Sequence, residues 1–213
     1  MGAERLKIAI QKKGRLHEAS LDFLNSLGLA FTPNGHSLIQ KCKNRDIDLV
    51  FLRDDDIPEY VSRGIADFAI VGQNVLLEKK IVINVLRELD FAKCSLAIAV
   101  PKNSVIKTIK DLEGERIATT YPHLLRNYLG QHNINAAIIP ISGSVEITPE
   151  LNLADAICDI VQTGNTLNAH NLKPLLTILE SRAVLITNDV DKNGKGLLKE
   201  LLLKQSVKYE QIN

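Results

Sequence analysis

Residues 48–72 read DLVFLRDDDIPEYVSRGIADFAIVG, and this stretch decides the fold class. The apolar runs at 48–52 and 66–71 have the length and composition of buried strands. Between them, Asp56 and Pro58 predict a helix start, because a carboxylate accepts free amide protons and proline has none to place. Gly64 then ends the helix. Strand, helix and strand at this spacing predict a parallel α/β sheet.

The same alternation continues on both sides of this stretch. An apolar run at 6–10 leads through a basic turn at 11–15 into a helix that ends near Gly28, and the pattern restarts after a long strand at 94–100. Further helices are expected at 106–112, 121–131, 145–151, 166–171 and 197–204, and further strands at 115–119, 136–141, 155–161 and 183–187. We therefore expect two lobes with mostly parallel sheets, 1–94 with 181–213 and 95–180. The default ligand site is a cleft between them.

The composition is that of an ordinary soluble globular protein. Of 213 residues, 45% are apolar and 24% charged, and the net charge of +1 with 4% aromatic residues argues against nucleic-acid binding. No segment is long and apolar enough for a signal peptide or a membrane span, so we expect a cytoplasmic protein. Cys42, Cys94 and Cys158 form no CxxC pair and no zinc-type cluster. They indicate reduced thiols, and we assign no metal bound directly by protein side chains.

Residues 155–167, DAICDIVQTGNTL, carry the clearest sign of chemistry. A strand runs into Thr163-Gly164-Asn165-Thr166 and then into a helix. The glycine lets amides approach a ligand, the helix start offers free N–H groups, and the threonines add hydroxyl donors. Asp159 could accept hydrogen bonds from a ribose diol while the loop holds a phosphate. The alternative is a plain turn with a threonine cap and a carboxylate at a strand edge, since short motifs recur by chance.

Other short segments extend this pattern over almost the whole chain. They are Lys13-Gly14-Arg15-Leu16, Arg53 with Asp56-Ile57-Pro58, Gly64-Ile65-Ala66-Asp67, Val71-Gly72, Ile117-Ala118-Thr119 with Tyr121-Pro122, Ser142-Gly143-Ser144-Val145-Glu146 and Leu153-Ala154-Asp155-Ala156. Together with the loop at 163–166, they resemble the ATP phosphoribosyltransferase family.

The resemblance implies the first step of histidine biosynthesis, in which ATP and phosphoribosyl pyrophosphate give phosphoribosyl-ATP and pyrophosphate with Mg²⁺. It also implies two lobes like those of periplasmic binding proteins of type II. The chain is similar to the family's short form, which works with a regulatory subunit resembling histidyl-tRNA synthetase. A homodimer within a hetero-oligomer is therefore expected.

The resemblance also distributes roles among the residues. Lys13, Arg15 and Arg53 would act on phosphates, Gly72, Tyr121, Ser142 and Gly143 would bind the nucleotide, and Glu146, Asp159, Thr163, Gly164, Asn165 and Thr166 would bind phosphoribosyl pyrophosphate. For some of these residues, a role without function is also possible. Residues 13–15 could be a solvated basic turn, Arg53 could form an ion pair with Asp55, and Tyr121 could serve in packing. Asp155 could be purely structural.

Three positions depart from the family pattern. Asn152 stands where glycine is usual, Asn74 where aspartate is common, and His36 where a basic residue is common. A histidine supplies positive charge only when protonated. Two rival functions also remain at this point: a solute-binding module with the same architecture, and a dinucleotide enzyme, which the absence of GxGxxG after the first strand disfavours.

Overall fold

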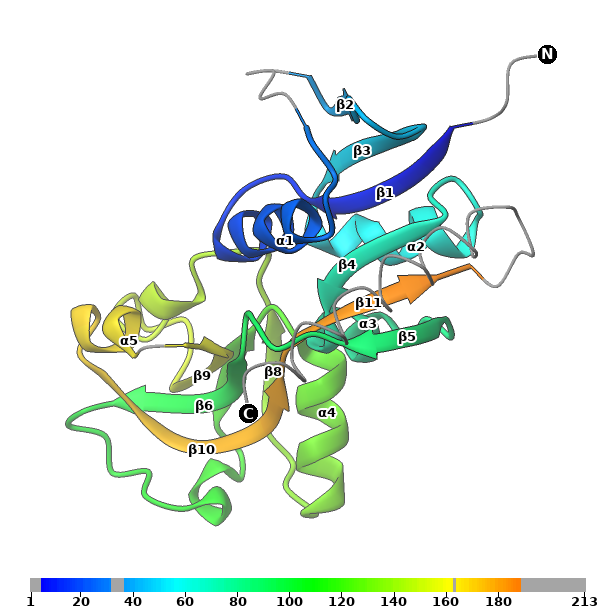
Figure 1. Cartoon of the computed structure of the whole chain (residues 1–213). Coiled ribbons are helices and arrows are strands. Elements are labelled where there is room, and N and C mark those ends of the chain that lie inside the picture. Colours follow the sequence, from blue (N-terminus) through cyan, green and yellow to red (C-terminus); the bar gives the residue numbers. More distant parts are fainter. Residues whose placement is uncertain (1–4, 32–36, 163, 189–213) are drawn as a thin grey trace, which may run out of the picture. The chain divides into compact units, whose positions relative to one another are not determined.

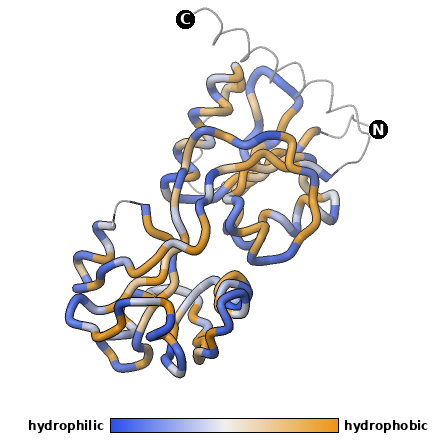
Figure 2. The backbone as a smooth tube through the Cα atoms, turned by 90° about the horizontal axis from the view of Figure 1, so that it is seen from below, coloured by the Kyte–Doolittle hydropathy of each residue, from blue (hydrophilic) through white to orange (hydrophobic). Residues whose placement is uncertain are grey.

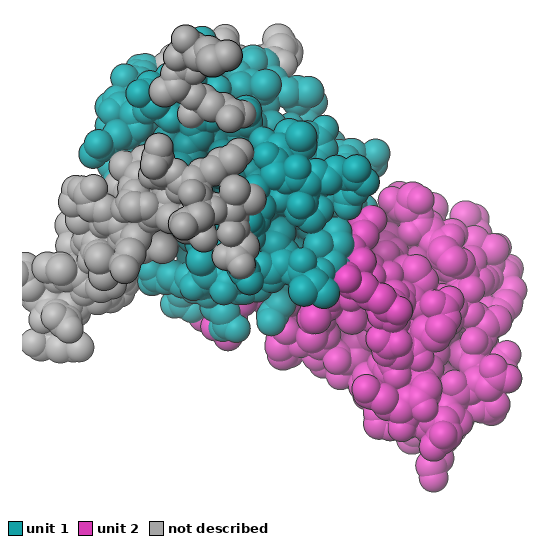
Figure 3. Space-filling view, turned by 90° about the vertical axis from the view of Figure 1, so that its right-hand side faces the viewer, with its two compact units in different colours: residues 1–76, 81–92, 183–213 teal, residues 77–80, 93–182 magenta. Residues whose placement is uncertain are grey.

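The computed structural model describes residues 5–31, 37–162 and 164–188 (Figure 1). Thr163, His36 and the helix expected at 197–204 lie outside the described residues. The chain divides into two compact units: unit 1 comprises Met1–Leu76, Ile81–Ala92 and Ala183–Asn213, and unit 2 comprises Leu77–Lys80 and Lys93–Arg182 (Figure 3). Apolar and polar stretches alternate along the backbone of both units (Figure 2).

Unit 1 contains a six-stranded sheet in the order β2-β3-β1-β4-β11-β5. Its strands are β1 (Leu6–Gln11), β2 (Ile39–Lys41), β3 (Ile47–Leu52), β4 (Phe68–Gly72), β5 (Asn84–Glu88) and β11 (Ala183–Thr187). Its helical elements are α1 (Arg15–Ser26), the 3₁₀ turn η1 (Asp54–Asp56), α2 (Ile57–Ser62) and the first residues of α3 (Gln73–Lys79). β1 pairs in parallel with β3 and β4, whereas β2, β11 and β5 join antiparallel.

The central strand β1 is buried on both of its faces. Ile8 and Ile10 pack in one apolar cluster with Leu24 of α1, and Ala9 packs in the opposite cluster with Ile57 of α2. Burial on both faces explains why this strand reads as a continuous apolar run instead of an alternating one. Because β1 is parallel to β3 and β4, the carboxyl ends of the three strands meet at one edge of the sheet. Ligands bind at this edge in folds of this kind.

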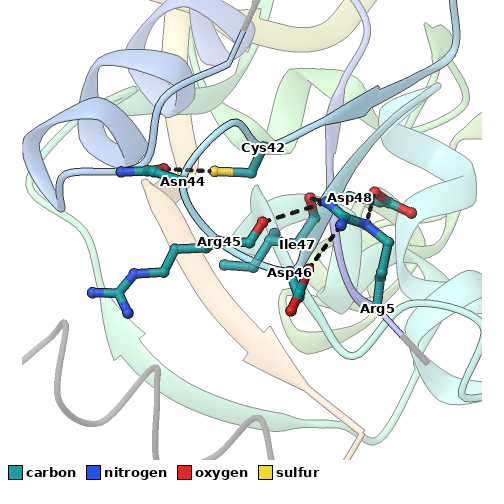
Figure 4. A network of polar contacts seen from close by, with 7 residues as sticks. All are labelled: Arg5, Cys42, Asn44, Arg45, Asp46, Ile47 and Asp48. Carbon is teal, nitrogen blue, oxygen red and sulfur yellow. Dashed lines mark hydrogen bonds and ion pairs between the residues drawn. The ribbon is translucent and has the colours of Figure 1, made fainter. Parts of the chain in front are cut away.

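Hydrogen bonds from Arg5 fix the amino-terminal ends of β1 and β3 (Figure 4). The Arg5 guanidinium donates to the Asp48 carboxylate at 2.7 Å and to Asp46 at 3.0 Å. It also donates to the carbonyl oxygen of Ile47 at 2.8 Å. These bonds tie the start of β1 to the turn before β3 and so support the register of the pair.

Unit 2 contains a five-stranded sheet in the order β10-β6-β9-β7-β8. Its strands are β6 (Cys94–Pro101), β7 (Arg116–Thr119), β8 (Ala137–Pro140), β9 (Ala156–Val161) and β10 (Leu172–Ser181). Its helical elements are the 3₁₀ turns η2 (Ile109–Leu112) and η3 (Val145–Ile147), α4 (Pro122–Gln131) and α5 (Asn165–Ala169). β7 pairs in parallel with β8 and β9, and β6 joins β9 and β10 antiparallel. Cys158 is buried in the core and Cys94 is half-buried.

The prediction of mostly parallel sheets is right for the pairs β1–β3, β1–β4, β7–β8 and β7–β9 and wrong for the other pairs, which are antiparallel. Three strands were also missed. β2 has three residues, and β5 is exposed throughout, so neither has the apolar pattern of a buried strand. β10 contains Pro174, which demotes a run to an edge strand, and its register with β6 shifts after that proline. The helix expected at 145–151 is only the short turn η3.

Candidate active site

Asp159 lies in β9, the strand that leads into the predicted phosphate loop. Its Oδ1 atom accepts the N–H of Ile160 at 2.8 Å and the hydroxyl of Thr120 at 3.4 Å. Burial raises the pKa of Asp159 and the charge of Glu146 raises it further, while the Ile160 N–H acts in the opposite direction. The structure thus brings two of the predicted carboxylates, Asp159 and Glu146, into one electrostatic environment.

The end of β7 is joined to β9 through a buried threonine. The Thr119 hydroxyl donates to the carbonyl oxygen of Cys158 at 2.6 Å and accepts the N–H of Tyr121 at 2.9 Å. This arrangement fixes the 119–121 turn beside Asp159. The half-buried Tyr121 side chain packs against the core of unit 2, which agrees with the packing alternative. Thr119 and Thr120 were not predicted as site residues, although their place at the carboxyl end of an apolar strand was a usable signal.

α4, which follows this turn, has its first amides occupied by a carboxylate. Glu78 accepts the N–H of His123 through one oxygen and the N–H of Leu124 through the other, both at 2.9 Å. A negative charge at a helix start satisfies amides that have no partner within the helix. Sequence reasoning missed Glu78, because this contact joins residues 45 and 46 positions apart.

The loop after β8 carries Ser142, Gly143 and Glu146. Ser142 and Gly143 are exposed, and a Cβ added at Gly143 would meet no atom within 4 Å. Ser144 has a left-handed backbone with φ of 51° and leads into η3, which holds Glu146 in a half-buried position. The loop therefore leaves open space at Gly143.

In the loop after β9, the structure describes Gly164, Asn165 and Thr166. Gly164 adopts a φ of 73°, which favours glycine, and stands as the N-cap of α5 without a side-chain cap. Asn165 and Thr166 are exposed. α5 has five residues, so its dipole is small and anion binding here would depend on amide N–H groups and hydroxyls. The predicted Thr163 lies outside the described residues.

In unit 1, the predicted cations lie after β1 and β3. Lys13 and Arg15 are exposed around Gly14, whose φ is 96°. Arg53 is exposed before η1, and its charge acts on Asp54. The pKa of Asp54 is raised, mainly by burial. The charge of Asp55 raises this pKa further, whereas the charge of Arg53 lowers it.

Two departures from the family pattern have physical explanations. A Cβ at Gly72 would collide with the buried Asn74 side chain, so Asn74 fills the space that the glycine leaves. Asn152 has a φ of 56°, and asparagine tolerates this left-handed conformation better than most residues. His36 lies outside the described residues.

Asp155 has the structural role that was its alternative reading. Arg116 donates to both carboxylate oxygens, from Nε at 2.9 Å and from the terminal guanidinium at 2.7 Å, and a further bond reaches the Asn152 carbonyl oxygen at 2.9 Å. These hydrogen bonds lower the pKa of Asp155 to about 2. Within residues 5–31, 37–162 and 164–188, no group of three or more His, Cys, Asp or Glu side chains could hold a metal ion.

The chain was compared with known proteins. The family model described as "HisG: ATP phosphoribosyltransferase" matches residues 53–206. An ATP phosphoribosyltransferase from Maricaulis maris is 41% identical over 98% of this chain and 76% of its own length. One from Cytophaga hutchinsonii is 44% identical over 94% of this chain and 71% of its own length.

Solved structures agree with this similarity. A chain from the ATP phosphoribosyl transferase (HisG:HisZ) complex of Thermotoga maritima has a TM-score of 0.80 at 32% identity, covering 97% of this chain and 99% of that one. The L-arginine-bound protein Tv2483 has a TM-score of 0.65 at 11% identity, covering 95% of this chain and 85% of that one. This second likeness concerns the fold alone.

The fold is therefore the α/β architecture of the type II periplasmic binding proteins, as predicted. Within that class, the chain belongs to the ATP phosphoribosyltransferase family, whose enzymes catalyse the first step of histidine biosynthesis. The prediction of a phosphoribosyltransferase is confirmed, and the solute-binding and dinucleotide alternatives are set aside. In the part of the chain that the structure describes, no helix has the length and apolarity needed to cross a membrane.

Proposed function

We propose that Asp159 and the 164–166 loop hold phosphoribosyl pyrophosphate in the ATP phosphoribosyltransferase reaction. The observation that carries this proposal is a desolvated carboxylate, fixed by an amide and a hydroxyl, a few residues before a glycine-capped helix start. The carboxylate would accept hydrogen bonds from the ribose hydroxyls, while the loop amides and the Thr166 hydroxyl would donate hydrogen bonds to the 5′-phosphate. Thr163 belongs to this proposal by its sequence position.

The reaction forms a bond from adenine N1 to the ribose C1′ carbon and breaks the bond from C1′ to pyrophosphate, which leaves with the bonding electrons. The N1 lone pair is free at neutral pH, so the attack needs no general base. Positioning the two substrates in line and stabilising the leaving group are then the main requirements. The exposed cations Lys13, Arg15 and Arg53 suit the second requirement.

Glu146 shares the site with Asp159. Burial is the main cause of the raised pKa of Asp159, and repulsion from the charge of Glu146 adds to it. A diol that donates hydrogen bonds, or the hydration shell of a cation, would relieve this repulsion. Their oxygen donors fit Mg²⁺, which neutralises pyrophosphate charge when it is bound with the substrate. We therefore assign Glu146 to the ribose or to a magnesium-bound ligand.

We propose roles in nucleotide binding for the loop around Ser142 and Gly143 and for Tyr121, all in unit 2, and separately for Gly72 in unit 1. Open space at Gly143 and the fixed 119–121 turn beside Asp159 support the first two assignments. Gly72 ends β4, where its lack of a side chain makes room for Asn74. ATP binding by these residues has its own test, because variants here should alter KM for ATP and leave KM for phosphoribosyl pyrophosphate unchanged.

We further propose that the chain works in the cytoplasm as a homodimer within a complex with a regulatory subunit. The support is the match over 97% of this chain to a chain of the Thermotoga maritima HisG:HisZ complex. The partner would resemble histidyl-tRNA synthetase. Mass photometry of the chain alone and after mixing with such a subunit tests this assembly; a single unchanged species would contradict it.

The activity test mixes the purified chain with ATP, phosphoribosyl pyrophosphate and Mg²⁺, and follows pyrophosphate release with and without the regulatory subunit. Release should require both substrates. Lys13→Ala should slow turnover, whereas Lys12→Ala, an exposed neighbour with the same charge, serves as the matched control. No turnover under either condition would contradict the proposal.

A further inference from the structure

We propose that His17 is a positioning residue that holds the basic turn at residues 11–15 in the shape that binds phosphate. This inference rests on the proposed role of Lys13 and Arg15 in that turn. His17 lies in the first turn of α1, and its side chain is half-buried.

His17 reaches back across the turn to the end of β1. Its Nδ1 atom lies 2.8 Å from the carbonyl oxygen of Gln11. A carbonyl oxygen only accepts hydrogen bonds, so Nδ1 must carry the proton. The bond closes a loop of chain that contains Lys12, Lys13, Gly14 and Arg15.

The ring of His17 is held in place by the core of unit 1. Its centroid lies 5.4 Å from that of Phe51, with 48° between the ring planes. Phe51 belongs to β3 and is 6% exposed. The imidazole is therefore held by packing against Phe51 and forms its hydrogen bond with the turn. We call this arrangement a brace, because a side chain fixed by the core restrains the turn.

The turn itself has features that make a brace useful. Gly14 has a φ of 96°, a Cβ placed on it would meet no atom within 4 Å, and it caps α1 without a side-chain hydrogen bond. On one side, the N–H of Lys12 donates to the carbonyl oxygen of Leu52 at 2.7 Å. The bond from His17 to Gln11 supplies the second anchor.

A fixed turn binds an anion better than a mobile one, because less conformational freedom is lost on binding. Removing the brace should therefore weaken phosphate binding even though His17 does not touch the ligand. The expected loss is about fivefold in affinity, which corresponds to one hydrogen bond.

Two substitutions separate the hydrogen bond from the packing. His17→Phe keeps a ring against Phe51 and removes the donor. His17→Asn keeps a donor in place of Nδ1 and removes the ring. Both are measured in the full chain by titration with pyrophosphate at fixed salt, beside Lys13→Ala, and by thermal unfolding.

We expect His17→Phe to raise the pyrophosphate Kd about fivefold, with a Tm close to that of the parent chain. His17→Asn should lower the Tm and change the Kd less than His17→Phe does. In turnover assays, His17→Phe should raise the KM for phosphoribosyl pyrophosphate by a larger factor than it lowers kcat.

The outcomes that overturn this inference are distinguishable from failure of the turn's own role. If Lys13→Ala weakens pyrophosphate binding and His17→Phe does not, the His17 inference is wrong and the turn's role stands. If Lys13→Ala leaves the Kd unchanged, the turn does not hold phosphate and both are wrong. If His17→Asn weakens binding more than His17→Phe does, ring packing and not the hydrogen bond is responsible.

Discussion

The hydroxyl of Thr119 donates to the carbonyl oxygen of Cys158 across the buried join of β7 and β9, at 2.6 Å. The Thr119 hydroxyl oxygen in turn accepts the N–H of Tyr121 at 2.9 Å, so one side chain connects the strand beside it with the turn that follows. Thr119 and Cys158 are both fully buried. A buried polar group must keep its partners, and this one determines where the turn lies relative to Asp159.

Replacing Thr119 with valine keeps the side-chain shape and removes the hydroxyl. The Cys158 carbonyl and the Tyr121 N–H then lose their partner, and unfolding free energy should fall by about 1–3 kcal/mol. Urea denaturation measures this loss. Thr120→Val is the control, since Thr120 makes one long bond of 3.4 Å and is half-buried. Equal losses in both variants would contradict the role given to Thr119.

Glu78 should stabilise the start of α4. Glu78→Gln keeps one acceptor and removes the negative charge, so unfolding free energy should fall by about 1 kcal/mol and the amides of His123 and Leu124 should exchange faster. Hydrogen exchange reads those amides directly. The control is Glu113→Gln, since Glu113 accepts a single amide, that of Asn135. Unchanged protection at His123 and Leu124 would show that Glu78 does not cap this helix in solution.

Asp159→Asn should impair catalysis and stabilise the fold. The raised pKa means that ionised Asp159 is less favourable in the folded chain than in the unfolded one. Its contribution is most favourable below pH 3.8 and is lost as the pH rises through the folded pKa. At neutral pH, the amide should therefore raise Tm by about 1–3 °C. Turnover should fall at least about tenfold, because a charged acceptor for ribose is lost.

These two effects of Asp159→Asn are measured on the same sample by thermal unfolding and pyrophosphate release. The amide still accepts the Ile160 N–H, so the strand end should stay intact. A lower Tm together with full activity would contradict the account.

The pair of Arg116 and Asp155 predicts an acid-side loss of stability. The pKa of Asp155 is lowered from 3.8 to about 2 by hydrogen bonds from Arg116. The stabilisation is complete above about pH 4 and is lost as the pH falls toward 2. Because the pair is partly exposed, its worth is about 1 kcal/mol at most. Urea midpoints of the parent and of Asp155→Asn should converge over this window, and a constant difference down to pH 2 would contradict the pairing.

Much of the fold could be predicted from residues 48–72 and the runs like them, because buried parallel strands and proline-marked helix starts leave local signals. β5 and β10 could not be predicted in this way. β5 is exposed at every position, so it has no buried face to produce a pattern. β10 is a long edge strand, but Pro174 and its register shifts interrupt the sequence pattern of a strand. It is recognised only from its antiparallel pairing with β6.

The candidate site was predictable where chemistry is local and unpredictable where it depends on contacts between distant segments. Asp159 and Gly164 belong to one short segment, and the glycine has a left-handed backbone. Glu78 and Thr119 act through partners about 40 positions away, and no spacing in the sequence shows such a contact. Asn152 departs from the family residue, yet its conformation is one that asparagine tolerates.

The most direct test of the central claim is the Kd of phosphoribosyl pyrophosphate with Mg²⁺, measured by titration calorimetry for Thr166→Ala and Asp159→Asn. Asn168→Ala, an exposed change in the same helix, is the control. We predict that both site variants weaken binding about fivefold or more while the control does not. Unchanged affinity in Thr166→Ala and Asp159→Asn would contradict the assignment of this substrate to the end of β9.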